Sequence, residues 1–329
     1  MSEKIHPVAV IGGGAAGTMA ALRCVLNNDE TLFFPGNQKD KKRSRALWVT
    51  KIENMPAHFN YKRGIEQPNR ETIDWIKKSP FAEKLDIQKN TSVTQITRDS
   101  EGVYTLKDDK ENFYRARYII LCTGIMDVQP HISGDIEPVF PYANMQSLDY
   151  CLRCDGHHVY GKKTGVIGHG NGAAWVAIML HERYEPPQMH IFLHGQKAQF
   201  TEDTKKLLSA YNVKVHAPEI VEIRGEKKKG ILASFVLADG SEVAVDMSFI
   251  SLGTIIYNEL AKSLGANLDE RGYVLTNEKG ESSVAGLYIA GDLRANAKKQ
   301  IYTAWDQAVD SADDINSRLR IEKRKSLKL

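Results

Sequence analysis

A glycine turn near the start of the chain constrains its fold more than any other feature. The apolar run 7–11 is typical of a buried parallel strand, and the residues after the turn have a helical pattern. Between them, Gly12 permits a tight turn, Gly14 lets the backbone approach a pyrophosphate, and Gly17 lets the helix pack against the strand. The helix would direct free N–H groups and its positive end at the phosphates. This unit predicts a dinucleotide site in a Rossmann-like fold.

One part of that pattern is missing. The second strand of such a fold usually ends in an acidic residue that binds the ribose hydroxyls. Here the second strand is expected at 31–36 and has no acid at its end. The basic stretch 37–45 that follows is expected to be a solvated loop. Another group must then hold the ribose.

A second unit of strand, glycine turn and helix is predicted for residues 162–180. Gly168, Gly170 and Ala173 occupy the three positions that need small residues. The alternative is that Gly168 and Gly170 only make a tight turn between a strand and a helix. If both units are what they resemble, the chain has two nucleotide-binding lobes.

Two further segments complete an α/β pattern. Residues 86–124 alternate short strands with polar turns, which predicts a small antiparallel meander that leads into a buried strand. Residues 282–319 predict another buried strand, ending at Gly291 and Asp292, and then a long helix. Asp292 would lie at the carboxyl end of that strand, where open α/β sheets bind ligands. The last residues, 320–329, form a basic tail that is expected to fray.

Composition excludes several classes of protein. A chain of 329 residues is long enough for two domains, and 42% hydrophobic and 26% charged residues suit a globular protein. The net charge of +3 is too small to indicate nucleic-acid binding. No apolar run approaches the roughly 20 residues that span a membrane. Because the first residues lead directly into a predicted strand, we expect no signal peptide. Four cysteines do not make a disulfide scaffold, so we expect a reducing, cytoplasmic setting.

The segment 150–158, Tyr-Cys-Leu-Arg-Cys-Asp-Gly-His-His, allows three interpretations. Cys151 and Cys154 have the spacing of a redox dithiol, and in a reducing compartment such a pair tends to be catalytic or metal-binding. With His157 and His158 they offer four candidate zinc ligands, although structural zinc normally joins two separated ligand pairs. Adjacent histidines on a strand would also point to opposite faces, which disfavours their binding one ion. Two inert buried thiols are the third interpretation.

The order of these motifs resembles the low-molecular-weight thioredoxin reductases, a class II family of FAD-dependent pyridine nucleotide-disulfide oxidoreductases. The order is a glycine fingerprint, Cys-Thr-Gly at 122–124, Cys-x-x-Cys-Asp-Gly, a second glycine fingerprint, and Ala-Gly-Asp at 290–292. The most specific element is the dithiol placed just before the second fingerprint. The segment 51–56, Lys-Ile-Glu-Asn-Met-Pro, resembles the family's flavin-side loop. Lys299 and Gln300 resemble its Arg-Gln pair, with lysine in place of arginine.

The resemblance implies an α/β fold of two Rossmann-like, three-layer ββα nucleotide-binding domains, the second inserted in the first. Residues 1–125 and 252–329 would form the FAD-binding domain, and residues 126–251 an NAD(P)H-binding-like domain that carries the dithiol. The residues implied to bind FAD are Gly12, Gly14, Ala15, Ala16, Gly17, Asn54, Thr123, Gly124, Gly291, Asp292, Lys299 and Gln300. The second nucleotide-like site would comprise Gly168, Gly170 and Ala173, and no metal site is expected.

The resemblance also assigns the redox roles. Cys154 would face the flavin, and Cys151 would exchange with the disulfide of a thioredoxin-like protein. Asp155 would donate and accept the proton of the released thiolate. The family's usual state implies a homodimer, without nucleic-acid or membrane partners.

The central domain departs from the family where NADPH should bind. The family has His-Arg-Arg and a further arginine there, which clamp the 2′-phosphate by charge-assisted hydrogen bonds. This chain has His194, Gly195 and Gln196, and only Lys197 is basic nearby. An NADH site would need an acidic residue at this strand end, and none is present. The sequence therefore disfavours both NADPH and NADH, and ferredoxin or another non-nicotinamide donor is the alternative.

Two functions are compatible with these features. The first is a thioredoxin reductase-like enzyme that passes electrons from FAD through Cys151 and Cys154 to a thioredoxin-like protein disulfide. The second is an FAD-binding relative without reductase turnover, which would serve as a binding, sensing or regulatory module.

Overall fold

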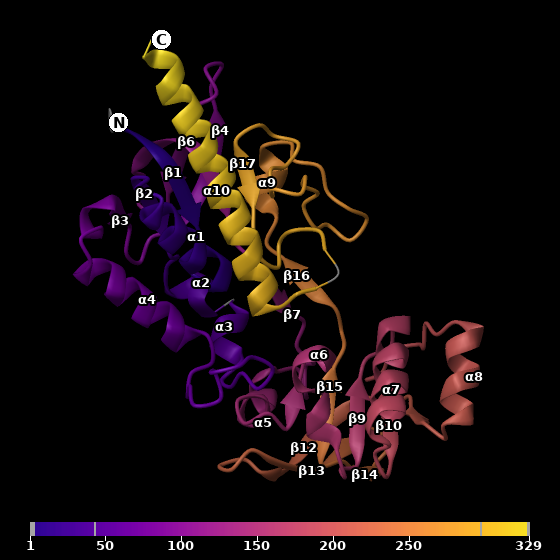
Figure 1. Cartoon of the computed structure of the whole chain (residues 1–329). Helices are drawn as coiled ribbons and strands as arrows, with labels where there is room; N and C mark the ends of the chain where they lie inside the picture. The colour runs from indigo at the N-terminus through magenta and orange to yellow at the C-terminus, as the bar shows by residue number, and fades with distance from the viewer. Residues whose placement is uncertain (1–3, 43, 297, 328–329) are drawn as a thin grey trace. The chain divides into compact units, whose positions relative to one another are not determined.

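The computed structural model describes residues 4–42, 44–296 and 298–327, and the chain divides into two compact units (Figure 1). The first unit comprises Met1–Leu47, Tyr61–Met126 and Ile256–Leu329. The second comprises Trp48–Asn60 and Asp127–Ile255. The short strands β7 (Ile125–Asp127) and β16 (Thr254–Ile256) pair where the chain passes between the units.

The first unit is built on one seven-stranded sheet. Its strands are β1 (Ile5–Ile11), β2 (Thr31–Phe34), β3 (Leu85–Ile87), β4 (Val93–Arg98), β5 (Tyr104–Asp108), β6 (Phe113–Leu121) and β17 (Leu287–Ile289). Its helices are α1 (Ala15–Leu26), α2 (Gln38–Lys42), α3 (Arg45–Trp48), α4 (Glu66–Lys78), α9 (Glu259–Ser263), α10 (Ile301–Ser326) and the 3₁₀ helix η1 (Ala82–Lys84).

The order of strands in this sheet is β3-β2-β1-β6-β5-β4, and β17 also pairs with β6. Strands β3, β2, β1, β6 and β17 are parallel, whereas β4, β5 and β6 form the predicted antiparallel meander. The long strand β6 pairs with β5 over its first half and with β17 over its second half. The parallel part therefore carries the carboxyl ends of β1, β6 and β17 side by side.

Alternation along β1 explains how the two faces of the sheet are covered. Val8 and Val10 pack against α1 and α10, whereas Ala9 and Ile11 pack against the meander and α9. Successive side chains of a strand point to opposite faces, so a run of apolar residues is buried on both sides. Burying one such valine contributes roughly 1.5–3 kcal/mol. Figure 1 shows α1 and α10 lying beside each other along this sheet.

The second unit is a three-layer ββα domain. Its five-stranded parallel sheet has the order β11-β10-β9-β15-β8, and a separate antiparallel sheet has the order β12-β13-β14. The strands are β8 (Leu148–Asp149), β9 (Thr164–Ile167), β10 (Met189–Phe192), β11 (Lys214–His216), β12 (Ile220–Glu226), β13 (Ile231–Leu237), β14 (Glu242–Ala244) and β15 (Met247–Ile250). The helices are α5 (Phe140–Ala143), α6 (Leu152–Asp155), α7 (Asn171–Tyr184), α8 (Glu202–Ala210), η2 (Glu137–Val139) and η3 (Gly156–Val159).

The layers of the second unit follow from the same alternation. Val166 and Ile191 belong to the core beneath α7, whereas Ile167 and Phe192 belong to the core beneath the antiparallel sheet. The α/β class and the Rossmann-like units that the sequence predicts are therefore confirmed. No helix in the described part of the chain is long and apolar enough to cross a membrane.

Three local features differ from expectation. Residues 48–60 group with the second unit, because Trp48 packs on Phe140 with ring centroids 4.5 Å apart and Thr50 donates to the Asn144 carbonyl. Part of the basic stretch 37–45 forms α2 instead of a loop. In addition, α10 continues to Ser326, whereas fraying was expected over 320–329, of which residues 328 and 329 lie outside the described residues. The bidentate pairing of Arg318 with Glu281 stabilises this last part of α10.

Candidate active site

The first glycine turn has the geometry of a phosphate cradle. Gly12 has φ +115°, and a Cβ there would lie 2.3 Å from the Cys122 carbonyl oxygen. A Cβ at Gly17 would lie 1.7 Å from the Gly12 carbonyl oxygen, so the first turn of α1 packs directly on the preceding strand end. No described atom lies within 4 Å of a Cβ at Gly14. Gly14 therefore leaves open the space that a pyrophosphate would occupy in front of α1.

The start of α1 has no counter-charge of its own. Among the described residues, no side chain caps the helix at Gly14, and no acidic residue lies in its first turn, which begins with Ala15 and Ala16. Free N–H groups and the positive helix end are therefore available to an anion. These properties fit the diphosphate of FAD.

Two other strand ends lie next to this turn. Thr123 and Gly124 follow β6, the parallel neighbour of β1, and the Thr123 hydroxyl donates to the Tyr257 carbonyl at 2.6 Å. Gly291 follows β17 with φ +82°, and a Cβ there would lie 2.9 Å from the Cβ of Ala16. Asp292, the next residue, is thereby brought to the start of α1. The structure places these predicted residues together at the carboxyl edge of one parallel sheet, where such folds bind ligands.

Charged groups beside Asp292 extend this edge. Arg45 Nη1 lies 3.4 Å from Asp292 Oδ2. The sequence assigned Arg45 to a solvated stretch, and only its pairing with Asp292 identifies it as part of the site. Lys299 is half-buried, donates to the Arg294 carbonyl at 2.6 Å and lies 3.8 Å from the centroid of the Tyr273 ring. Burial lowers the pKa of Lys299 to about 8. Its ammonium is therefore engaged inside the protein.

The remaining predicted FAD residues are placed differently. Gln300 is buried and immediately precedes α10, which begins at Ile301. Asn54 belongs to the segment 48–60 of the second unit. The first acidic residue after β2 is Asp40, whose Oδ2 accepts hydrogen bonds from the Asn37 N–H and the Ser92 hydroxyl. Asp40 is thus engaged within the protein, which agrees with the absence of a ribose-binding acid at the end of β2.

The structure joins Cys151 and Cys154 in a disulfide, with their Cα atoms 5.3 Å apart. Cys151 precedes α6, and its Sγ accepts a hydrogen bond from the Cys154 N–H at 3.2 Å. A backbone N–H directed at sulfur stabilises the thiolate form of a cysteine. Both residues are half-buried, and Asp155, the last residue of α6, is buried. The interpretation as inert, fully buried thiols does not fit this pair.

Cys24 and Cys122 provide the contrast. Both are free and buried, and burial raises the pKa of the Cys122 thiol to about 12. Burial raises the pKa of the Cys24 thiol as well. They pack in the apolar core formed with α1 and α10 and are core residues, not part of the dithiol chemistry.

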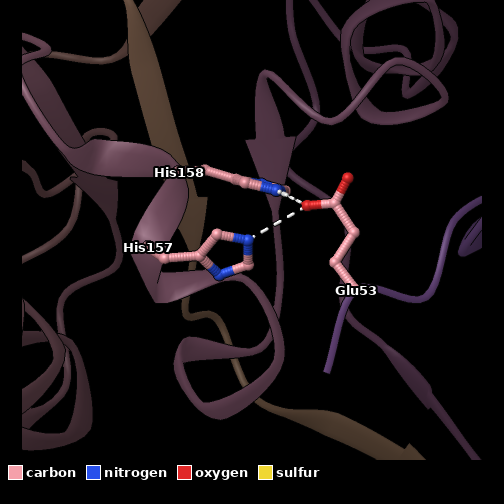
Figure 2. Close-up of side chains that lie close together, drawn as sticks. All are labelled: Glu53, His157 and His158. Atoms are coloured by element: carbon pink, nitrogen blue, oxygen red, sulfur yellow. Dashed lines mark hydrogen bonds and ion pairs between the residues drawn. The ribbon is translucent and has the colours of Figure 1, made fainter. Parts of the chain in front are cut away.

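The two histidines after the dithiol do not lie on a strand, and the expectation that they point to opposite faces is wrong. They lie on η3, where successive side chains are closer in direction, and their ring centroids are 4.4 Å apart. Nε2 of His157 and Nε2 of His158 lie 3.0 Å and 2.7 Å from the same atom, Oε2 of Glu53 (Figure 2). Sequence analysis missed Glu53 in this role because it is about a hundred residues away along the chain.

His158 has a second carboxylate partner. Its Nδ1 lies 2.7 Å from Oδ2 of Asp149, a buried residue of β8. The hydrogen bond to Asp149 raises the pKa of His158 to about 9. Burial raises the pKa of Asp149, although the imidazole opposes this shift. Two carboxylates therefore face the two nitrogens of one imidazole ring.

The second glycine turn repeats the geometry of the first. A Cβ at Gly168 would lie 2.4 Å from the Ser251 carbonyl oxygen and 2.7 Å from the Cβ of Ala173. No described atom lies within 4 Å of a Cβ at Gly170, which precedes α7. The unit thus combines a tight turn with an open position in front of a helix, as a nucleotide site requires.

A cavity of about 390 Å³ lies beside this turn, in the second unit. It is lined by Gln129, Pro130, His131, His169, His194, Gly195, Gln196, Glu219 and Leu252. These residues include His169 from the turn and His194, Gly195 and Gln196 from the end of β10. In a Rossmann-like unit this is where the ribose of a dinucleotide binds.

His194 is not available as a cation in this cavity. Its Nε2 lies 3.0 Å from the His131 carbonyl oxygen, and its Nδ1 lies 3.1 Å from the Ile220 nitrogen. Because Nε2 must donate and Nδ1 must accept, the ring is neutral, and burial lowers its pKa further. None of the described lining residues is arginine or lysine. Glu219 supplies an acid that the strand end itself lacks, and sequence analysis missed it because it comes from the connection after β11.

Comparison with known proteins gives a consistent result. Residues 6–312 match the family model described as pyridine nucleotide-disulphide oxidoreductase. The chain is 28% identical to a thioredoxin reductase of Treponema pallidum, over 92% of this chain and 93% of that protein. It is also 28% identical to a thioredoxin reductase of Bacillus subtilis, over 92% and 91%. A crystal structure of a putative thioredoxin reductase from Bacillus anthracis has the same fold, with a TM-score of 0.81, 21% identity, and 97% and 99% of the two chains covered.

Proposed function

Because the chain belongs to the pyridine nucleotide-disulphide oxidoreductase family, we propose that it is a flavin-dependent disulfide reductase that reduces a thioredoxin-like protein through Cys151 and Cys154. The observation that carries this proposal is the Cys151–Cys154 disulfide, in which one sulfur already accepts a backbone N–H. The cradle of Gly12, Gly14 and Gly17 supports FAD as the cofactor.

The proposed reaction assigns a role to each residue of the dithiol segment. FAD, when bound and reduced by the electron donor, would supply the two electrons that open the disulfide. The Cys151 thiolate, stabilised by the Cys154 N–H, attacks the partner's disulfide and forms a mixed disulfide while one partner thiolate leaves. Asp155 supplies the proton to that thiolate. The Cys154 thiolate then attacks Sγ of Cys151, which releases the second partner thiol and restores the Cys151–Cys154 disulfide.

We further propose that the electron donor is not NADPH. The cavity at the end of β10 has a neutral His194 where a cationic clamp would be needed, and Glu219 adds a carboxylate. A carboxylate repels the 2′-phosphate of NADPH, and no described lining residue can compensate by a positive charge. The donor would then be a protein such as ferredoxin, another reductant that is not a nicotinamide, or NADH, whose ribose hydroxyls Glu219 could bind.

Anaerobic reduction of the purified yellow protein tests both proposals. NADPH at micromolar concentration should leave the flavin oxidised for minutes, whereas dithionite should reduce it at once. Fast bleaching by NADH would identify NADH as the donor and Glu219 as its ribose-binding acid. Addition of oxidised thioredoxin should then yield free thiols with the unaltered protein and none with Cys151→Ser. Flavin that stays reduced in the presence of several thioredoxins would favour the binding or sensing alternative instead. From the family resemblance we also propose a cytoplasmic homodimer, for which light scattering should give about twice 36.8 kDa.

A further inference from the structure

Three side chains converge beside the dithiol segment, although the proposed disulfide exchange uses none of them. Nε2 of His157, Nε2 of His158 and Oε2 of Glu53 all lie within 4.8 Å of one another (Figure 2). Both imidazole nitrogens point to the same carboxylate oxygen, at 3.0 Å and 2.7 Å. All three residues belong to the second unit.

The arrangement of hydrogen-bonding groups calls for positive charge at these side chains, which either a second proton on His158 or a bound cation can supply. Carboxylates only accept hydrogen bonds, and His158 has one on each ring nitrogen, Asp149 on Nδ1 and Glu53 on Nε2. A neutral imidazole has a single N–H, so it can donate to only one of the two. Its second nitrogen would then direct a lone pair at a carboxylate. A positive ion between Nε2 and Oε2 turns both lone pairs into favourable ligands.

Asp149 provides an independent sign of a metal centre. Its side chain is buried, and its Oδ2 lies 2.7 Å from Nδ1 of His158. Histidine ligands of metals almost always donate their other N–H to such a carboxylate, which fixes the tautomer and the orientation of the ring. With a metal ion in place of the second proton, this tautomer would direct the Nε2 lone pair of His158 at the ion beside Glu53.

We propose that Glu53, His157 and His158 bind a divalent metal ion, best matched by Zn²⁺, with Asp149 orienting His158. Two imidazole nitrogens and one carboxylate oxygen form a ligand set that zinc uses with a fourth position left open. Zinc holds such ligands at about 2.0–2.2 Å, so neighbouring ligand atoms would be roughly 3.3 Å apart. The present separations of 2.7 Å and 3.0 Å need to widen by only a few tenths of an ångström. Exposure of His157, whose side chain is 47% accessible, leaves a path for the ion to enter.

This site differs from a Cys-x-x-Cys-x-x-His-His zinc site, because it contains no sulfur. The cysteines are joined in a disulfide, and the third ligand comes from the segment 48–60. The ion would therefore link that segment to the turn that follows the dithiol. Its binding does not depend on the redox function or on FAD.

Zinc titration of the untagged, full-length protein in its disulfide form tests the proposal. After treatment with a chelator, the protein should take up one Zn²⁺ per chain with a Kd of roughly micromolar or lower, measured by competition with a chromophoric chelator. His157→Ala and Glu53→Gln should each weaken binding at least tenfold, and Asp149→Asn about 10–100-fold. His131→Ala removes an exposed histidine of the same unit and should leave the Kd unchanged.

The cysteines are controlled separately. The double variant Cys151→Ser/Cys154→Ser should bind zinc as tightly as the unaltered protein. Binding that appears only after reduction and disappears in this double variant would overturn the proposal in favour of a thiolate site. The proposal would also fall if the disulfide form took up no zinc, because a protonated imidazole would then be the only cation at the site. It would fall as well if His157→Ala bound zinc with the same Kd as the unaltered protein.

Discussion

Replacing Gln196 by arginine and Glu219 by glutamine should convert a poor NADPH site into a usable one. Both residues are exposed and line the cavity at the end of β10, so both substitutions should be tolerated by the fold. The arginine would add a guanidinium able to bind a 2′-phosphate, and the glutamine would remove a carboxylate that repels it. His194 is left unchanged, because its ring holds the His131 and Ile220 backbone in place.

The size of the effect follows from the exposure of these residues. A charge-assisted hydrogen bond contributes about 1.5–3 kcal/mol, and the lower end applies at an exposed position such as Gln196. That alone corresponds to roughly a tenfold gain in kcat/KM for NADPH. Removal of the exposed Glu219 carboxylate adds up to about 1 kcal/mol, or roughly another fivefold. NADH has no 2′-phosphate, so its reaction should gain no more than about twofold.

Stopped-flow measurement of flavin bleaching without oxygen gives the rate for each nucleotide. Ser209→Arg is the charge-matched control, because Ser209 is exposed on α8 and does not line the cavity. This control should leave the NADPH rate unchanged. Fast bleaching of the unaltered protein by micromolar NADPH, or equal gains for NADPH and NADH in the double variant, would refute this account of the cavity.

Three further predictions concern the cofactor, the dithiol and the fold. Gly14→Ala should weaken FAD binding without lowering the Tm of the FAD-free protein, because its Cβ meets open space. Gly17→Ala should lower both the affinity for FAD and the Tm, because its Cβ would lie 1.7 Å from the Gly12 oxygen. Fluorescence titration measures the affinity, and thermal melts measure the Tm. Cys154→Ser should accumulate a mixed disulfide with thioredoxin on non-reducing gels and Cys151→Ser should not, so equal trapping by both would contradict the assigned roles. Burial, with smaller contributions from His216 and Lys214, lowers the pKa of His190 to about 4, so below about pH 6.5 the unfolded chain binds a proton that the folded chain does not. Between pH 6.5 and pH 4, the free energy of unfolding should therefore fall by about 3 kcal/mol more in the unaltered protein than in His190→Phe. Denaturant melts at each pH would measure this difference.

The parts of the fold that sequence analysis predicted are those set by local pattern. The run before Gly12 is buried on both faces of a parallel sheet, so it contains only apolar residues and the strand is easily recognised. The glycine turns could be predicted because their spacing between a strand and a helix is a local pattern. The steric need is local only at Gly17, which meets the Gly12 oxygen, whereas Gly12 and Gly168 meet backbone atoms of distant segments. The disulfide partners are three residues apart, so the spacing alone suggested them.

The parts that sequence analysis missed depend on contacts between distant segments. Glu53 reaches His157 and His158 across about a hundred residues, and nothing near Glu53 in the chain indicates this. Glu219 enters the cavity from the connection after β11 instead of from the strand end, where the pattern would place an acid. His157 and His158 were expected on a strand, but they lie on the 3₁₀ helix η3 and contact Glu53, and His158 also contacts Asp149. Local propensity does not contain these long-range interactions.

A thiol count after a single reduction tests the central claim most directly. The protein, with FAD bound, would be reduced without oxygen by a stoichiometric amount of dithionite and mixed with excess oxidised thioredoxin, and the new thioredoxin thiols would be alkylated and counted. Because dithionite delivers two electrons per chain, the account predicts close to two thioredoxin thiols per chain, restoration of the Cys151–Cys154 disulfide, and no thiols with Cys151→Ser. A protein that takes up the two electrons and transfers none to thioredoxin, or equal transfer by Cys151→Ser, would contradict it.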